Sequence, residues 1–153
     1  MRRKDKEITD LAEIEAIINR SLVCRLAMVD GDLPYIVPLC FGYDKNKLYF
    51  HTGTKGKKID ILKQNPHVCV EFDIDCKARP GKTACKWGMQ YKSVIGYGKA
   101  SFLESESSKR QALDFIMRQY GGDAEQYPDA KLKITAIIEV GIERLTAKAS
   151  PVE

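Results

Sequence analysis

The feature that most constrains the fold is a run of short apolar segments alternating with polar turns in the first third of the chain. Residues 21–29 and 34–43 have the composition of β-strands, and an Asp-Gly turn lies between them. A polar turn over 44–47 then leads into a third strand at 48–52. Turns this short join neighbouring antiparallel strands. The sequence therefore predicts an antiparallel meander here.

The rest of the chain supplies three more strands and the helices that cover them. Its charged stretch 73–90, which contains Pro-Gly and two cysteines, is predicted to form a long loop or an excursion from the barrel. Six antiparallel strands closing on one another predict a mainly β fold, a six-stranded antiparallel barrel with helices. We expect one domain over residues 1–153, with residues 1–8 flexible. The further strands are expected at 68–72, 91–103 and 133–146, and the helices at 9–20, after the turn at 53–56, and at 105–120.

Composition limits the classes of function. The net charge of +4 is too small to indicate nucleic-acid binding, and no apolar run approaches the roughly 20 residues of a membrane span. No signal peptide is recognisable, so a cytoplasmic protein without a membrane partner is expected. The five cysteines lack the paired spacing of zinc ligands, which predicts free thiols and no metal site.

The segment from Leu48 to Pro66 carries the clearest indication of a ligand. A predicted strand is followed by a turn rich in Gly, Thr and Lys, and then by the start of a helix. Helix N-termini favour negative charge, and glycines allow backbone N–H groups to face a ligand. Lys57 and Lys58, and less clearly Lys55, add positive charge at the same place. The pattern predicts a site for a phosphate monoester.

Five motifs in order along the chain identify a family resemblance. They are Gly31-Asp-Leu-Pro-Tyr-Ile-Val-Pro-Leu39, Leu48-Tyr-Phe-His-Thr52, Gly56-Lys-Lys58, Asn65-Pro-His-Val-Cys-Val-Glu-Phe72 and Tyr91-Lys-Ser-Val-Ile-Gly-Tyr-Gly-Lys-Ala100. With these motifs the chain resembles the FMN-binding split-barrel family typified by pyridoxamine 5′-phosphate oxidase. Within that family it looks most like the nitroimidazole-resistance (Nim-type) branch.

The resemblance implies a homodimer with FMN at the subunit interface. By position, the strand at 36–39 would lie along the flavin ring and offer main-chain hydrogen bonds. His51 and Thr52 would lie near the phosphate and ribityl chain, and the two lysines would neutralise the phosphate. Ser93 would approach the flavin from the long strand, either of the same subunit or of the partner subunit. The cofactor-binding residues implied are thus Val37, Pro38, Leu39, His51, Thr52, Lys57, Lys58 and Ser93.

Several single residues leave alternatives open. His51 is the one candidate for a catalytic group, but it is also explained as a polar residue at a strand end. Cys76 and Cys85 are either ordinary loop cysteines or thiols made reactive by the basic residues around them. Trp87 and Tyr91 either cover the ligand site or pack against a loop.

The leading functional hypothesis is an FMN-dependent oxidoreductase that passes electrons to a small nitroaromatic or quinone-like acceptor. NAD(P)H would serve as a transient donor, because no Gly-x-Gly-x-x-Gly motif is present to hold it. Residues 142–153 do not match the Arg- and His-bearing segment with which the true oxidase holds pyridoxamine phosphate, so that activity is not expected. The alternatives are a flavin store or redox sensor without turnover, a haem-binding protein, and a barrel that binds another phosphorylated ligand.

Overall fold

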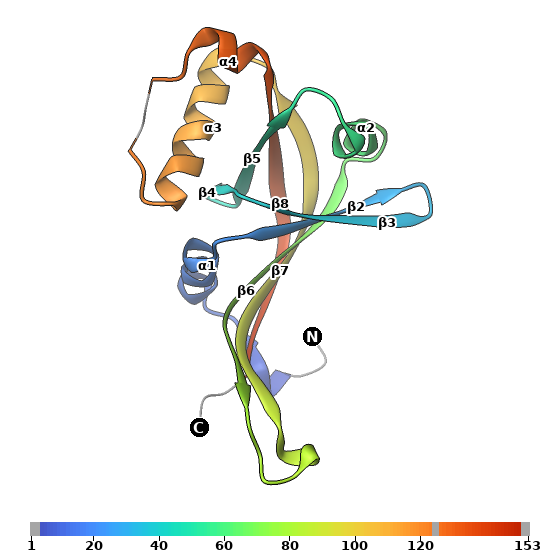
Figure 1. Cartoon of the computed structure of the whole chain (residues 1–153), viewed down its shortest axis with the longest axis vertical. Coiled ribbons are helices and arrows are strands. Elements are labelled where there is room, and N and C mark those ends of the chain that lie inside the picture. The colour runs from blue at the N-terminus through green and yellow to red at the C-terminus, as the bar shows by residue number, and fades with distance from the viewer. Residues whose placement is uncertain (1–3, 124–125, 151–153) are drawn as a thin grey trace.

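The computed structural model describes residues 4–123 and 126–150. One antiparallel sheet has the strand order β3-β2-β6-β7-β8-β5-β4, and β1 pairs with β8 (Figure 1). The strands are β1 (Glu7–Ile8), β2 (Cys24–Asp30), β3 (Leu33–Leu39), β4 (Gly42–Asp44), β5 (Lys47–Gly53), β6 (His67–Arg79), β7 (Gly88–Leu103) and β8 (Thr135–Ser150). The helices are α1 (Leu11–Arg20), α2 (Lys57–Gln64), α3 (Glu106–Gln119) and α4 (Asp129–Lys133), with short 3-10 turns η1 (Lys4–Lys6) and η2 (Ala84–Lys86).

The connection between β3 and β4 shows that this sheet curls back on itself. The two strands are the opposite ends of the strand order, yet only Cys40 and Phe41 separate them in sequence. Two residues span only about 10 Å, so the end of β3 and the start of β4 must lie close together. The predicted mainly β, barrel-type fold is confirmed. Residues 4–123 and 126–150 form eight strands rather than six, because 34–43 divides into β3 and β4 and because β1 is added.

A continuous apolar core fills the barrel. Its largest fully buried side chains include Phe41, Phe50 and Phe72, and the rings of Phe41 and Phe72 meet edge to face at 5.1 Å. One face of α1 and one face of α2 add isoleucine and leucine side chains to this core. Burial of this apolar surface is the main source of stability for the barrel.

A second apolar cluster lies under α3, on the other face of β5 and β8. Tyr49 stacks on Phe115 with ring centroids 5.1 Å apart, and Ile137 is fully buried beneath them. Both faces of β8 are therefore covered at this level. The predicted apolar face of β8 contains Ile138 and Val140, but it misses Ile137 and includes Ile134, which is exposed.

The C-terminal end of α3 is fastened to the end of α1. The Gln119 side-chain amide donates to the carbonyls of Ile18, Asn19 and Ser21 at 3.0–3.3 Å. The Tyr120 hydroxyl donates to the Leu22 carbonyl and accepts from an amide of the β3–β4 connection. Two adjacent residues thus satisfy backbone groups where α1 ends and the sheet closes.

Of the two forms expected for residues 73–90, the structure has the excursion, and it is a paired β-hairpin rather than an irregular loop. β6 continues to Arg79 and β7 begins at Gly88, and the pairing resumes at Lys77 after an irregularity that follows Ile74. The resulting hairpin projects away from the barrel (Figure 1). None of residues 76–90 is buried, so no apolar alternation marked these strands in the sequence. We call residues 76–90 the arm.

The N-terminal segment also takes part in the sheet. Residues 1–3 lie outside the described part of the chain, whereas Glu7 and Ile8 pair with Lys148 and Ala147 of β8. Ile8 packs into the main core. The last two residues of the segment expected to be flexible therefore have backbone partners in the sheet.

Candidate functional site

The predicted phosphate turn folds as an uncapped helix N-terminus. The amides of Ile59 and Asp60 donate to the Gly56 carbonyl, so those of Lys57 and Lys58 have no acceptor within α2. Gly56 has φ 134°, which favours glycine, and the space where a Cβ would stand is open. No side chain of a described residue caps the helix. Free amides and lysines together form a suitable anion-binding surface.

Lys57 ties this turn to the β2–β3 hairpin. Its ammonium lies 3.5 Å from a carboxylate oxygen of Asp30 and 4.9 Å from the ring centroid of Tyr35. The phosphate turn and the edge strand β3 are therefore neighbours, as the resemblance requires. Sequence analysis missed Asp30 and Tyr35, because nothing local marks a contact between residues more than twenty positions apart.

β3 lies at an edge of the sheet, and β2 is its one pairing partner among the described strands. Val37 and Leu39 point inward and pack against the core, whereas Ile36 and Pro38 are exposed on the outer face. Proline has no N–H, so Pro34 and Pro38 suit positions whose backbone groups point away from β2. The edge therefore presents the Ile36 N–H, flanked by carbonyls, to an incoming ligand.

His51 and Thr52 lie near the end of β5, a few residues before the phosphate turn. His51 pairs with Ile137 of β8 and is exposed, on the α3 side of the sheet, whereas Thr52 is half-buried. The two side chains alternate across the strand and so point to opposite faces. Within one subunit, the His51 and Thr52 side chains therefore cannot both contact a ligand that lies on one face of β5.

Ser93 is not part of the same group of residues within one subunit. It pairs with Asp73 of β6 and Lys148 of β8, and it lines a small hollow of about 70 Å³ with Ile95, Thr146 and Lys148. The β8 partners of Ser93 and of His51, Lys148 and Ile137, are eleven residues apart, which is about 36 Å of strand. The predicted site residues thus form two separate groups.

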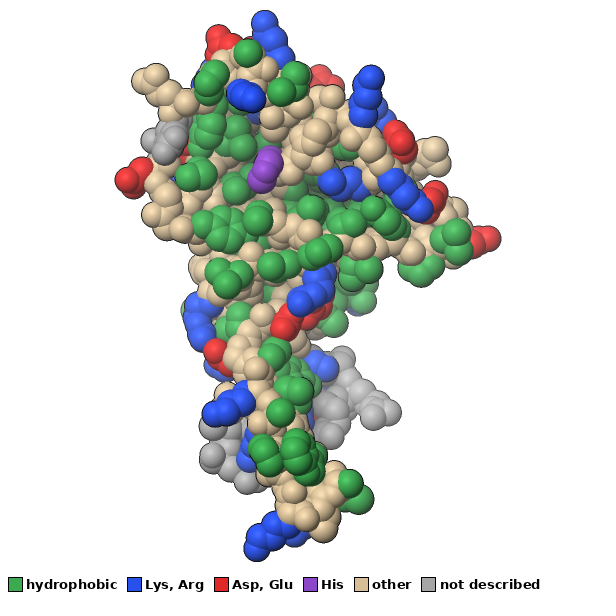
Figure 2. Space-filling view, in the orientation of Figure 1, with side chains coloured by type: hydrophobic (Ala, Val, Ile, Leu, Met, Phe, Trp, Pro, Cys, Tyr) green, Lys and Arg blue, Asp and Glu red, His purple; other side chains and the backbone are tan. Residues whose placement is uncertain are grey.

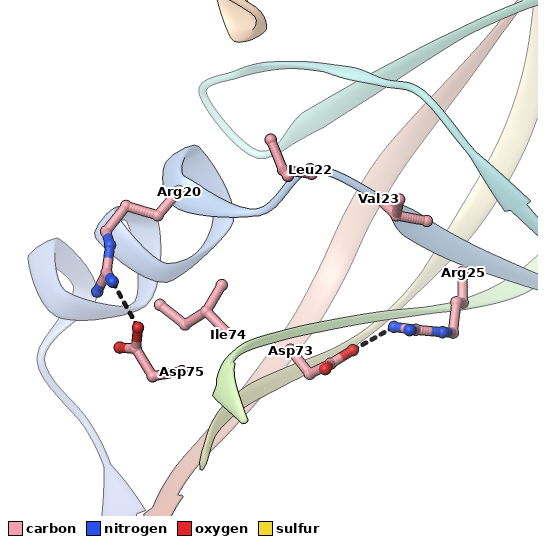
Figure 3. A pocket seen from close by; sticks show the side chains of 7 residues that line it. All are labelled: Arg20, Leu22, Val23, Arg25, Asp73, Ile74 and Asp75. Carbon is pink, nitrogen blue, oxygen red and sulfur yellow. Dashed lines mark hydrogen bonds and ion pairs between the residues drawn. The ribbon is translucent and has the colours of Figure 1, made fainter. Parts of the chain in front are cut away.

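A larger hollow, of about 340 Å³, lies between the end of α1, the start of β2 and β6 (Figure 3). Three ion pairs made by two arginines frame it. Arg20 meets Asp75 at 2.7 Å, and Arg25 bridges Asp73 and Glu71. Its charges are neutralised in pairs, and it contains none of the predicted site residues. The remaining lining residues are Leu22, Val23 and Ile74.

The thiol of Cys76 is not activated. Its Sγ donates to a carboxylate oxygen of Asp73 at 2.9 Å, and this hydrogen bond raises the pKa of Cys76 to about 11. The same bond, with Arg25 nearby, lowers the pKa of Asp73. This contact favours the interpretation of Cys76 as an ordinary thiol, and Cys85 lies exposed at the tip of the arm.

The described residues also limit the type of site that the chain can form. Over residues 4–123 and 126–150, no three or more His, Cys, Asp or Glu side chains come close enough to hold a metal ion. None of the helices formed by these residues is long and apolar enough to cross a membrane.

Comparison with known proteins places the chain in a family. Residues 10–149 match the family described as pyridoxamine 5′-phosphate oxidase. The chain belongs to the pyridoxamine 5′-phosphate oxidase family. A candidate 5-nitroimidazole antibiotic resistance protein of Bacteroides thetaiotaomicron is 35% identical, with 94% of this chain and 86% of that one covered and a TM-score of 0.84. The predicted family resemblance is confirmed.

Two other proteins are similar to this chain. The FAD and haem binding protein of Mycobacterium smegmatis shares the fold, with a TM-score of 0.87 and 16% identity over 96% of this chain and 74% of that one. The uncharacterised protein RA0666 of Rhizobium meliloti is 34% identical over 87 residues, which are 57% of this chain. That match spans only half the length of the Rhizobium protein.

Proposed function

We propose that this member of the pyridoxamine 5′-phosphate oxidase family is an FMN-dependent oxidoreductase that reduces a small nitroaromatic or quinone-like acceptor. The observation that carries the proposal is the contact of Lys57 with Asp30 and Tyr35. It sets an uncapped, lysine-bearing helix N-terminus beside a free strand edge. A flavin mononucleotide needs both features, one for its phosphate and one for its ring.

The residues present fit that cofactor. The free amides of Lys57 and Lys58, together with the open space at Gly56, suit a phosphate. The Ile36 N–H and the neighbouring carbonyls of β3 suit the polar edge of a flavin ring. The candidate resistance protein of Bacteroides supports the nitroaromatic acceptor by its similarity along nearly the whole chain.

A homodimer would complete the site. Ser93 lies too far along the sheet to share a ligand with His51 of its own subunit, so it would serve the flavin of the partner. The outer face of the sheet suits such contact, because Ile36, Ala27, Cys69 and Tyr97 form one cross-strand row. Ile36 and Tyr97 are exposed large apolar residues of this row, and Figure 2 shows hydrophobic side chains gathered over the sheet.

The flavin, when bound, would supply the redox chemistry. The protein would bind and orient it. Lys58 and the helix amides would hold the phosphate, and Lys57 would fix the distance between the phosphate turn and β3. Hydride transfer to a flavin needs alignment more than a proton shuttle, so the main task of these residues would be to position the cofactor.

The test is a flavin titration of purified protein. The double variant Lys57→Ala with Lys58→Ala should bind FMN about tenfold or more weakly, because charge-assisted hydrogen bonds to phosphate are lost. The control is Lys131→Ala with Lys133→Ala, which removes the same charge from α4. Equal affinity in the two double variants would place the phosphate elsewhere.

An absorbance spectrum separates this proposal from its alternatives. Flavin bands that bleach when NADPH is added anaerobically support a reductase. Flavin bands that persist with every donor favour storage or sensing. A Soret band in place of flavin bands would indicate haem. If neither chromophore binds, the remaining alternative is a barrel that binds another phosphorylated ligand.

A further inference from the structure

The arm carries the whole net charge of the protein. Residues 76–90 contain four of its 25 Lys and Arg residues and none of its 21 Asp and Glu residues, against a total net charge of +4. The remainder of the chain is therefore electrically balanced. Among the described residues, no ion pair neutralises Lys77, Lys82 or Lys86. Charge this concentrated on a small element favours an anionic ligand.

The tip of the arm is hollowed. A cavity of about 480 Å³ lies there, within the range of small-molecule sites. Three basic side chains line it, from Arg79, Lys82 and Lys86, and Gly81 and Gly88 also border it. The remaining lining residues are Pro80, Met89 and Ser150.

Apolar side chains stand beside the basic ones. Trp87 is 58% exposed and Met89 is 50% exposed, and neither belongs to an apolar core cluster. Figure 2 shows basic and hydrophobic side chains together at the far end of the arm. An exposed indole beside lysines suits a flat ring attached to phosphate, because rings stack on aromatic faces while phosphates pair with ammonium groups.

We propose that the tip of the arm binds a nicotinamide dinucleotide by its phosphates and its adenine ring. Lys82, Lys86 and Arg79 would hold the phosphates, and Trp87 would stack on the adenine ring. The identity of this ligand as an electron donor rests on the proposed flavin function, whereas its binding at the arm does not.

The position of the arm agrees with that role. Gly88 and Ser93 are five residues apart on β7, about 17 Å of strand. This is comparable with the length of an extended dinucleotide. A donor held by its phosphates at the tip could therefore place its nicotinamide near Ser93, where the partner's flavin is proposed to lie.

The shape of the tip distinguishes a small nucleotide from larger anionic partners. A single-stranded nucleic acid needs a basic groove with several stacking aromatics, and the arm has one exposed tryptophan. A membrane surface favours a convex apolar tip, whereas here the basic groups line a cavity. A compact phosphorylated ligand fits these features best.

The chain contains its own reporter for the test, because Trp87 is its only tryptophan. NADP⁺, which cannot donate a hydride, is titrated into flavin-free and FMN-loaded protein while Trp87 fluorescence is followed. We expect saturable quenching in both forms, weakening as salt is raised. Lys82→Ala with Lys86→Ala should raise the Kd about tenfold or more. The control, Lys131→Ala with Lys133→Ala, should leave it unchanged.

Other results would overturn the proposal. These are no saturable quenching, the same Kd in the arm variant and the control, or tighter binding of an oligonucleotide or of anionic vesicles. Shielding of Trp87 from acrylamide in the free protein would mean that a second copy covers the arm. Lys57→Ala with Lys58→Ala separates the two proposals, because it should lose FMN and retain NADP⁺.

Discussion

The barrel and the arm are two parts of one sheet, yet different forces hold them. In the barrel, Phe41, Phe50 and Phe72 are completely buried, and helices cover the outer faces of several strands. In the arm, β6 and β7 continue to pair, but no side chain over 76–90 is buried. Backbone hydrogen bonds alone give a hairpin little stability in water. The arm therefore depends on the barrel for its shape.

This difference indicates how the two parts can vary. The side chains of the barrel are constrained by packing, so most of them are committed to the fold. The side chains of the arm are free of that constraint and can be chosen for charge or for contact with a ligand. The predictions that follow test the contrast and the boundary between the two parts, from the largest expected effect to the smallest.

Truncating an aromatic side chain should matter in the barrel and not in the arm. Phe72→Ala removes a fully buried ring that packs against Phe41, and should lower the free energy of unfolding by about 3–5 kcal/mol. Trp87→Ala should change it by less than about 0.5 kcal/mol. Urea unfolding followed by circular dichroism at one protein concentration measures both, and similar losses would mean that the arm is packed against something.

Adding a methyl group to a glycine should give the same contrast on a smaller scale. A Cβ at Gly98 would lie 2.1 Å from the Gly141 carbonyl oxygen, so Gly98→Ala must shift the β7–β8 pairing and should cost about 1–3 kcal/mol. At Gly88 a Cβ meets no atom within 4 Å. Gly88→Ala should be neutral or stabilise by a few tenths of a kcal/mol. Thermal unfolding of both variants decides whether the arm tolerates what the barrel does not.

At the boundary between the two parts, the Asp73 carboxylate should slow the reaction of the Cys76 thiol. Because the Asp73 carboxylate raises the pKa of Cys76 to about 11, Asp73→Asn should speed alkylation of Cys76 at pH 8 by about tenfold. Mass spectrometry resolves each cysteine, and Cys85 in the same arm serves as the control. An unchanged rate at Cys76 would show that the hydrogen bond to Asp73 does not persist in solution.

The same pair affects stability in a predictable direction. The pKa of Asp73 is lowered in the folded state, so its contribution is present above its ordinary pKa and is lost as the pH falls through the folded value. The raised pKa of Cys76 gives a contribution that is present below pH 9 and lost as the pH rises towards 11. Solvent screening limits the contribution of the Asp73 carboxylate to the free energy of unfolding to about a few tenths of a kcal/mol. The difference in the free energy of unfolding between the native protein and Asp73→Asn should therefore become smaller at low pH.

The parts of the fold that the sequence predicted are those with a single buried face. Leu26 and Met28 alternate with less buried residues, and the helix of Ile14, Ile17 and Ile18 buries one side, so local patterns indicated both elements. The arm was missed because neither of its faces is buried. Ile137 was missed because both faces of β8 are covered there.

The sequence predicts which residues belong to the site but not how they are arranged in space. The phosphate turn was recognisable because its glycines, hydroxyls and lysines are consecutive. The contact of Lys57 with Asp30 and Tyr35 was not, because it depends on how the hairpin packs against α2. The separation of Ser93 from His51 follows from the register along β8, which no local pattern specifies.

The partner of β5 has a consequence for synthesis in the cell. Leu48 pairs with Val140, so β5 emerges from the ribosome 92 residues before the strand it needs. At usual rates of translation this is a wait of about 5–18 seconds. During that time an apolar strand keeps an unpaired edge, which is a site for misassociation. Production of this protein should therefore respond to chaperone supply and to the speed of translation through its second half.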